Sequence, residues 1–346
     1  MPVTSRSEAP NRALSPSRWP CNSRNRAFVA ISIGLLAAAA IYSSQQPPGV
    51  PITDWDEIWV GSRALLQGRE PYAVIDSLFR GGRFEYPLIY PGTSLVVTAP
   101  FALAPHAIAL GLWSGVGASG LAWVLTRRGW WGLFGLGSAA YFHAFMLAQW
   151  SPLLTGAIAV PWLGFLWAAK PTIGLPLLIG WPSKPALLGG LGLLALSLLI
   201  LPGWPQAIAA RAHTAPHVLP IILRPGGVLL LLALLRWRLP EARLLAALAV
   251  IPQTTVPYEM VPLLLIPRSA RQMVLFAGLT VAAFWLAGHF QPPQSHTDLP
   301  GTIVRHWPYW LLLVYLPALL MVLRYPKSQQ ASWWSRPSRT SEGRAP

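Results

Sequence analysis

The sequence predicts an all-α polytopic membrane protein, and three observations lead to this fold class. Of the 346 residues, 53% are hydrophobic and only 11% are charged, and the mean hydropathy is +0.46. A soluble domain carries roughly 25% charged residues. Apolar stretches follow one another along most of the chain, and its 36 Pro and 29 Gly lie among Leu, Ala and Trp, as is common in membrane helices.

The net charge of +15 points to a membrane rather than to nucleic acid. The arginines cluster at the ends of apolar stretches, as the positive-inside rule expects. Membrane lipid is therefore a predicted partner, and nucleic acid is not. The single cysteine, Cys21, excludes an intramolecular disulfide and a metal site built from cysteines.

The chain is expected to begin with a disordered cytoplasmic tail at residues 1–26, which carry five Arg and one Glu. This tail does not have the pattern of a secretory signal. The first span is predicted at 27–43, close to the roughly 20 residues that a bilayer needs. The charge rule then places residues 44–106 outside as the first outer loop.

A helix lying on the membrane surface is predicted near the start of this loop. Apolar and polar residues recur there on opposite sides at helical spacing, which is typical of an interfacial helix rather than a crossing one. The apolar set is Ile58, Trp59, Leu65 and Leu66, and the polar set is Asp56, Glu57, Arg63 and Gln67. Gly68 is expected to end the helix, and Pro71 to prevent its continuation.

Residues 86–105 are apolar but are divided by four prolines. They form either a complete span or a half-inserted hairpin ahead of a true span at 107–126. The charges favour the second alternative, because Arg127 and Arg128 belong in the cytoplasm and need an even number of crossings before them.

The rest of the chain predicts further membrane segments, several of them short or rich in proline. They lie near 129–148, 152–169, 171–182, 185–201, 226–237, 243–257, 272–288 and 307–323. Arg-rich turns near 236–243 and 268–271 are expected inside, and residues 202–225 and 289–305 outside. No repeat of fixed period is found. We therefore expect one domain at 27–323 with roughly nine to eleven membrane segments, in the plasma (inner) membrane.

A second cytoplasmic tail is predicted at 324–346, which carries five Lys and Arg and no Asp. Both termini are then cytoplasmic. Tryptophans at segment ends are expected to be interface anchors. They are Trp130, Trp131, Trp204, Trp307 and Trp310.

Six of the 11 acidic residues fall between positions 54 and 85. Asp54 and Asp56 are the candidates for chemistry among them. Carboxylates beside a membrane segment are often merely solvated, and Asp54 could also cap a helix with Glu57 as its capping-box partner. The functional alternative is a general base that takes a proton from a hydroxyl nucleophile.

The order of residues in this loop is similar to that of a known enzyme family. It reads Asp54, eight residues, Arg63-Ala-Leu-Leu, then Gly68 and Pro71-Tyr72. This resembles the first outer loop of glycosyltransferase family 87, which belongs to the GT-C class. Three further blocks follow in the family's order, so that the resemblance covers about residues 50–180. They are "FEYPLIYPGTSLVVTAPFALAP" at 84–105, "AQWSPLL" at 148–154 and "AAKPTIGLPLL" at 168–178.

The chain departs from the family's pattern at two places. Ala148 stands where relatives carry Gly before the glutamine, here Gln149. The distance from Gln149 to Lys170 is also short, and one straight crossing would place the two residues on opposite sides. A break at Pro161 and Gly164 would instead keep both near one cavity.

The resemblance implies a GT-C-like helical bundle and a membrane glycosyltransferase. Such enzymes transfer a sugar from a polyprenyl-phosphate carrier to a glycan or glycolipid acceptor on the outer leaflet, with inversion. Asp54 matches the family's base and Asp56 is the second choice. The leaving phosphate needs positive charge, and Lys170, Arg211 and Arg224 are the candidates. Gln149 and Tyr72 match family motifs, and Glu259, in "PYEM", resembles a Tyr-acidic turn in relatives.

Several roles stay open at this point. Lys170 either binds the phosphate or extends its ammonium to the membrane interface, and Glu259 either lines the cavity or pairs with a cation. His213 and His217 have metal-like spacing, but Pro216 lies between them and no carboxylate is near, so no metal site is predicted. Two other functions compete with the enzyme: a transporter or flippase of a lipid-linked saccharide, and an inactive protein that keeps the fold.

Overall fold

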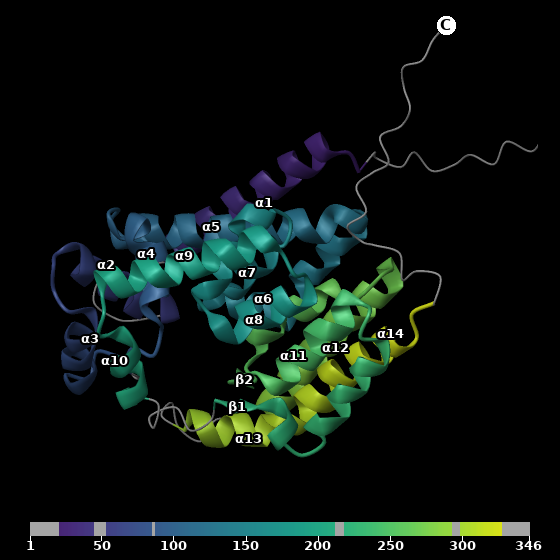
Figure 1. The fold of residues 1–346 in the computed structure, drawn as a ribbon. Helices are drawn as coiled ribbons and strands as arrows, with labels where there is room; N and C mark the ends of the chain where they lie inside the picture. Colours follow the sequence, from purple (N-terminus) through teal and green to yellow (C-terminus); the bar gives the residue numbers. More distant parts are fainter. Residues whose placement is uncertain (1–20, 45–52, 85–86, 212–217, 293–297, 327–346) are drawn as a thin grey trace, which may run out of the picture.

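The computed structural model describes residues 21–44, 53–84, 87–211, 218–292 and 298–326, with the backbone alone at 299. The predicted terminal tails lie almost wholly outside these ranges, as do Glu85, His213 and His217. The described chain is almost entirely helical (Figure 1). Its two short strands, β1 (Leu219–Pro220) and β2 (Pro252–Gln253), form one antiparallel pair.

The described elements follow one another as short and long helices. The first half contains α1 (Ser23–Ser43), α2 (Asp54–Leu66), α3 (Pro71–Arg80), α4 (Gly92–Ala102), α5 (His106–Leu125), η1 (Thr126–Arg128), η2 (Trp130–Gly137), α6 (Ala139–Met146), α7 (Ser151–Ala157) and η3 (Pro161–Ala168). The second half contains α8 (Pro171–Gly180), α9 (Lys184–Ile200), α10 (Trp204–Arg211), η5 (Ile221–Leu223), η6 (Gly227–Arg236), α11 (Pro240–Val250), η7 (Pro257–Leu265), α12 (Ala270–Phe290), α13 (Leu299–Trp310), η8 (Leu311–Tyr315) and α14 (Leu316–Leu323).

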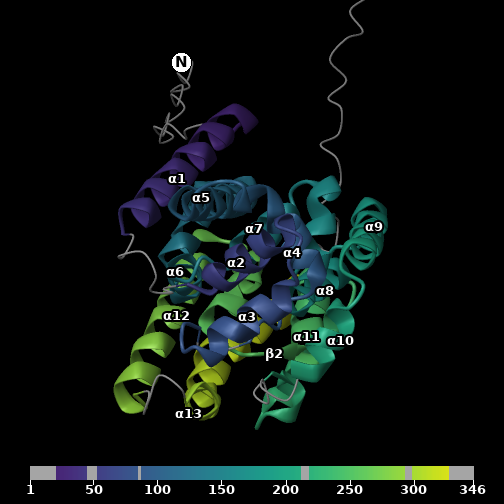
Figure 2. The ribbon, with the colours of Figure 1, turned by 90° about the vertical axis from the view of Figure 1, so that its left-hand side faces the viewer.

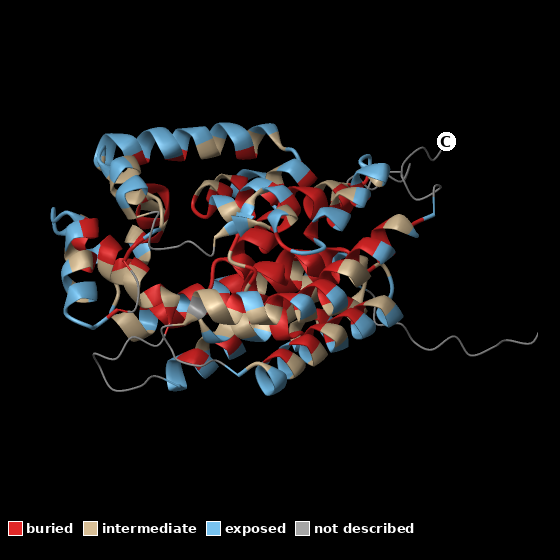
Figure 3. Ribbon diagram, turned by 90° about the horizontal axis from the view of Figure 1, so that it is seen from below, coloured by how far each residue is buried: buried red, intermediate tan, exposed pale blue. Residues whose placement is uncertain are grey.

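Within the described ranges, four helices are long and apolar enough to cross a membrane, or five if the bent pair α9–α10 forms one span. The four are Ser23–Ser43, His106–Arg128, Ala270–Phe290 and Pro300–Leu323, and α9 and α10 meet at 92°. These helices are compatible with a multi-pass membrane protein. Large apolar residues on them are exposed, among them Phe28 and Leu36 on α1 and Leu199 on α9. Figure 3 shows exposed residues along the outer helices and buried residues gathered between them.

The other predicted segments are short or broken helices in the described structure. Segment 129–148 divides into η2 and α6, and segment 152–169 divides into α7 and η3. The breaks have local causes: Gly129 has φ +136°, Ser138 caps α6, and Pro161 begins η3. The predicted nine to eleven membrane segments therefore outnumber the described helices that are long enough to cross a membrane.

The predicted first outer loop contains two helices, α2 and α3, followed by α4. Helix α2 ends before Gly68, whose φ is +68°, as predicted, and Pro71 then starts α3. On α2, Trp55, Ile58 and Ser62 are buried, whereas Leu66 is exposed. Helix α4 lies beside α2 and is its chief neighbour (Figure 2).

The apolar stretch 86–105 contains one short helix, α4. It has 11 residues, about 16 Å at the rise of an α-helix, whereas the hydrocarbon core is about 30 Å thick. Helix α5 after it is long enough to cross. A helix too short for a complete span thus precedes one of sufficient length, and the half-inserted hairpin stays a prediction.

A buried ion cluster joins the ends of several helices. Glu241, at the start of α11, has no exposed side-chain surface. Arg128 Nη2 donates to its Oε1 at 2.7 Å, and Arg268 Nη2 donates to both carboxylate oxygens at 3.1 Å. The Arg268 guanidinium also lies 3.6 Å from the ring centroid of Tyr325, just after α14. Helix α14, which Tyr325 follows, lies at the end of the molecule opposite to α2, α3 and α10 (Figure 1).

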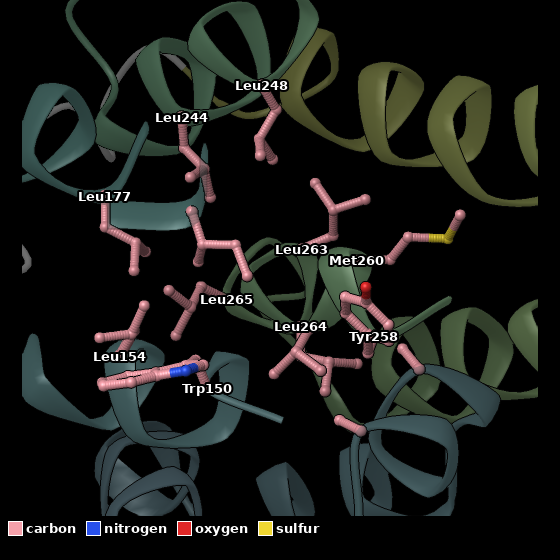
Figure 4. Packing of buried hydrophobic residues seen from close by; sticks show 14 of the residues in the cluster. Trp150, Leu154, Leu177, Leu244, Leu248, Tyr258, Met260, Leu263, Leu264 and Leu265 are labelled. Carbon is pink, nitrogen blue, oxygen red and sulfur yellow. The ribbon is translucent and has the colours of Figure 1, made fainter. Parts of the chain in front are cut away.

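The core lies where α7, α8 and α11 surround η7 (Figure 4). All nine residues of η7 are buried, including Tyr258 and Glu259. The labelled leucines of α8 and α11 face those of η7 across this core (Figure 4). Glu259 lies on this central segment, so its carboxylate must be paired or hydrogen-bonded.

Candidate functional site

Three polar side chains from separate elements form one hydrogen-bonded chain. Gln149 donates through Nε2 to Asp54 Oδ2, and Lys170 Nζ donates to Gln149 Oε1 at 2.9 Å. A carboxylate only accepts and an ammonium only donates, so these two partners fix the orientation of the amide. Asp54 and Lys170 are thus separated by one amide group, although they are 116 positions apart in the sequence.

Aromatic packing holds Asp54 in place at the start of α2. Trp55 is fully buried, and its ring stacks on Trp113 of α5 with centroids 4.6 Å apart. Trp113 in turn meets Trp150 edge to face, also at 4.6 Å. This packing fixes α2 against α5 and α7. The N-terminus of a helix also favours a negatively charged side chain, and Asp54 lies in the first turn of α2.

A Schellman turn at the end of α6 directs Gln149 toward Asp54. The N–H of Gln149 donates to Ala144 O at 2.8 Å and that of Ala148 to Phe145 O at 3.1 Å, the bonding pattern of this motif. The motif requires a left-handed residue, and Ala148 has φ +48°. Trp113 Nε1 donates to Ala148 O at 2.9 Å and anchors the turn. Glycine suits this left-handed position best, and this chain has Ala there.

Lys170 lies at a break in the chain, not in a continuous crossing. Pro171 disfavours a helical conformation at Lys170, whose φ and ψ are −132° and 86°, and α8 begins at the proline. Hydroxyls at the start of α4 hold the preceding turn: Thr93 Oγ1 donates to Ala168 O at 2.8 Å, and Ser94 donates to Ala169 O. Helix α7 and η3 therefore return the chain to Gln149, as the broken-helix alternative predicts.

The ammonium of Lys170 lies between two tyrosine rings. Nζ is 5.3 Å from the centroid of Tyr90, whose hydroxyl accepts from it at 3.4 Å, and 4.6 Å from the centroid of Tyr258. Both contacts are of the kind that favours a cation. Among the described residues, no carboxylate oxygen lies within 4.0 Å of Nζ. The nearby carboxyl of Glu259 instead accepts from the N–H of Thr255 at 2.9 Å.

Asp56 helps to cap α2, and the predicted capping arrangement is wrong. Thr53, not Asp54, is the N-cap of α2, and its capping-box partner is Asp56, not Glu57. Thr53 donates to Asp56 Oδ2 through N at 3.0 Å and Oγ1 at 2.8 Å, and His106 Nε2 lies 2.8 Å from Oδ1. Burial raises the pKa of the Asp56 carboxyl, but the hydrogen bonds from His106 and Thr53 outweigh it, and the pKa lies below its ordinary value.

Arg211 and Tyr72 lie outside this chain of hydrogen bonds. Arg211, at the end of α10, binds both oxygens of Asp76 on α3, one of them through Nε at 3.0 Å. Its guanidinium lies 5.3 Å from the ring centroid of Tyr72. The hydroxyl of Tyr72 donates to Tyr90 O at 2.8 Å. These residues therefore attach α10 to the outer loop and support the backbone of Tyr90.

Arg224 is buried beside Trp307, with its guanidinium 5.9 Å from the ring centroid. Trp307 Nε1 donates to Pro225 O at 2.9 Å. Trp307 and Trp310 are each only 3% exposed, so their prediction as interface anchors is wrong. They lie on the inner face of α13, where neighbouring elements cover them.

Tyr90 and Tyr258 were not singled out from the sequence. Both stand in quoted stretches, "LIYPG" and "PYEM", but no local pattern says that two tyrosines 168 positions apart enclose one lysine. Among the described residues, no three His, Cys, Asp or Glu side chains are grouped to hold a metal ion. Comparison of the chain with protein families, with curated proteins and with solved structures gave no match.

Proposed function

We propose that this protein is a membrane glycosyltransferase of GT-C type that uses a polyprenyl-phosphate-linked sugar. The observation that carries the proposal is the chain Asp54–Gln149–Lys170, which joins a carboxylate to an ammonium beside the membrane. The resemblance of the outer loop to glycosyltransferase family 87 supplies the reaction class. Asp54 takes the proton of the acceptor hydroxyl, and the oxygen bonds to the anomeric carbon while the bond from this carbon to the phosphate oxygen breaks.

Lys170 is the residue that we assign to the leaving phosphate. A phosphate monoester leaves as an anion and is stabilised by a preorganised cation in a site with little water. Lys170 is buried and is held by an amide, a hydroxyl and two rings. Gln149 lies between the ammonium and the Asp54 carboxylate and is hydrogen-bonded to both.

An apolar groove beside Lys170 suits the hydrocarbon chain of the donor. It has a volume of about 250 Å³ and lies between η3, α8 and α9. Its walls include Pro171, Leu175, Leu187, Leu191 and Trp204. Leu175, Leu187 and Leu191 are also exposed on the outer surface, where a chain in the bilayer could enter. Pro171, which lines the groove, follows Lys170 directly in the chain.

We place the Arg-rich end of the molecule in the cytoplasm and the end with α2 and α3 outside, in the plasma membrane. The positive-inside rule supports this orientation, because Arg26, Arg127, Arg128 and Arg268 gather at one end. The acceptor then meets Asp54 at the outer leaflet.

The test is release of polyprenyl phosphate from a radiolabelled polyprenyl-phosphate sugar by the purified protein in lipid. Lys170→Gln should reduce donor use at least tenfold, because it removes the proposed phosphate contact. Lys184→Gln is the matched control, since Lys184 is exposed at the start of α9. Equal activity of both variants would remove Lys170 from the site. If the unaltered protein releases no polyprenyl phosphate but moves the labelled lipid across the bilayer, the transporter alternative replaces the enzyme.

A further inference from the structure

A second cavity lies beyond the ring of Tyr258, one of the two tyrosines that enclose Lys170. It has a volume of about 360 Å³ and is formed by α6, α12, α13 and the segment 255–257. The ring of Tyr258 separates it from Lys170: Tyr258 stacks on His143, which lines the cavity, with centroids 5.6 Å apart and an angle of 17°. The same ring lies 4.6 Å from Lys170 Nζ.

The lining of this cavity differs in chemistry from that of the groove beside α9. The groove carries one hydroxyl, that of Thr93, which donates to Ala168 O, and the two indole N–H groups of Trp167 and Trp204. The second cavity carries four polar side chains, which are His143, Thr255, Thr302 and His306. Of these, His143 has a buried Nδ1 with no hydrogen-bond partner within the described ranges. A buried nitrogen of this kind favours a ligand that bears hydroxyl groups.

Flat aromatic walls complete the cavity. Phe284 and Trp310 meet with centroids 6.5 Å apart, and the ring of His143 lies 6.1 Å from Phe284. A pyranose or furanose ring presents a C–H face that packs on such rings and hydroxyl groups that reach the histidines and threonines. The volume also falls in the ordinary range of small-ligand pockets. A hydrocarbon chain cannot form hydrogen bonds with these four polar side chains.

We propose that this cavity binds the saccharide head of the acceptor. The inference rests on the proposed function, and it adds where the acceptor lies and which part of it is recognised. The acceptor's sugar then lies beyond Tyr258, and its reacting hydroxyl reaches past this ring to Asp54. The donor chain and the acceptor head approach Lys170 from the sides of Tyr90 and Tyr258 respectively.

Gly288 on α12 lines the cavity, and a Cβ added there meets no atom within 4 Å. A substitution at this position therefore tests the inference directly. Gly288→Trp should fill the cavity. Gly278→Trp is the matched control: Gly278 lies on the same helix, also has open space, and does not line the cavity. His143→Phe is a second variant that keeps a ring against Tyr258 but removes both nitrogens. Gly→Trp in a helix does not lower helix propensity.

The measurement is saturation-transfer NMR with the protein in lipid nanodiscs and the methyl glycosides of glucose, mannose, galactose and arabinose as probes. We expect binding of at least one probe, at least a tenfold rise in its Kd in Gly288→Trp, a several-fold rise in His143→Phe, and no change in Gly278→Trp. Absence of binding by all four probes, or equal binding by both tryptophan variants, overturns the inference.

Release of polyprenyl phosphate, measured on the same samples, separates this inference from the proposed function. Probe binding that Gly288→Trp abolishes, without any release by the unaltered protein, upholds the cavity and overturns the enzyme. Release that persists with an unchanged acceptor KM in Gly288→Trp upholds the enzyme and overturns the cavity.

Discussion

Replacing Asp54 by Asn separates the role of Asp54 from that of Asp56. The change removes the negative charge but keeps an oxygen that accepts from Gln149 Nε2, and it leaves the helix cap intact because Thr53 and Asp56 form the capping box. We therefore expect the free energy of unfolding to change by less than about 0.5 kcal/mol, as at sites without a buried polar or packing defect.

The rate should fall far more than the stability. Loss of a general base reduces the rate by about 10²–10⁴-fold, which corresponds to about 3–5 kcal/mol of barrier. Asp56→Asn should show the opposite pattern. It weakens the contacts with Thr53 and His106, at about 1–2 kcal/mol of stability, while the folded protein keeps a rate within a few-fold of the original.

The sign of the pH dependence follows from the position of Asp56. Its folded pKa lies below the ordinary value, so its carboxylate contributes stability above the unfolded pKa, roughly 4, and this contribution is lost as pH falls through the folded pKa. The stability difference between the original protein and Asp56→Asn should therefore shrink as the pH is lowered below roughly 4.

The assay is transfer of labelled sugar from polyprenyl phosphate in membranes, on equal amounts of folded protein, with unfolding followed separately in detergent. If Asp54→Asn keeps near-normal turnover while Asp56→Asn loses it, the assignment of the base is wrong by two positions. If both variants remain active, the outer loop does not supply the base and the mechanism fails.

Three further predictions concern the fold. Ala148→Gly should raise the free energy of unfolding by about 0.5–1 kcal/mol, because the left-handed strain at φ +48° is relieved and exceeds the entropy that glycine adds to the unfolded chain; a melting series that shows destabilisation contradicts the Schellman turn. Glu241→Gln should destabilise the protein by about 3 kcal/mol or more, since Arg128 and Arg268 then lack a buried anion, and unchanged unfolding in detergent would show that the cluster is dispensable. Cys21 is exposed, and a membrane-impermeant maleimide should label it only after the cells are opened; labelling of intact spheroplasts would reverse the proposed orientation.

Local sequence patterns predicted the class of fold and several boundaries. Low charge with repeated apolar stretches predicted a helical protein with membrane-length helices, and Gly68 and Pro71 predicted where α2 ends. The broken path from Gln149 to Lys170 was one of two alternatives that Pro161 and Gly164 left open. These features depend on hydropathy and backbone freedom within a few neighbouring residues, which is why the sequence alone contains them.

Tertiary structure decided which polar side chains meet. Thr53 caps α2 where Asp54 was predicted to do so, and the contact of Asp56 with His106 exists only because α2 packs beside α5. Enclosure of Lys170 by Tyr90 and Tyr258, and burial of Trp307 and Trp310, arise from chain segments far apart in sequence. Composition and periodicity report what a residue prefers as its surroundings, whereas its actual neighbours depend on how the helices pack.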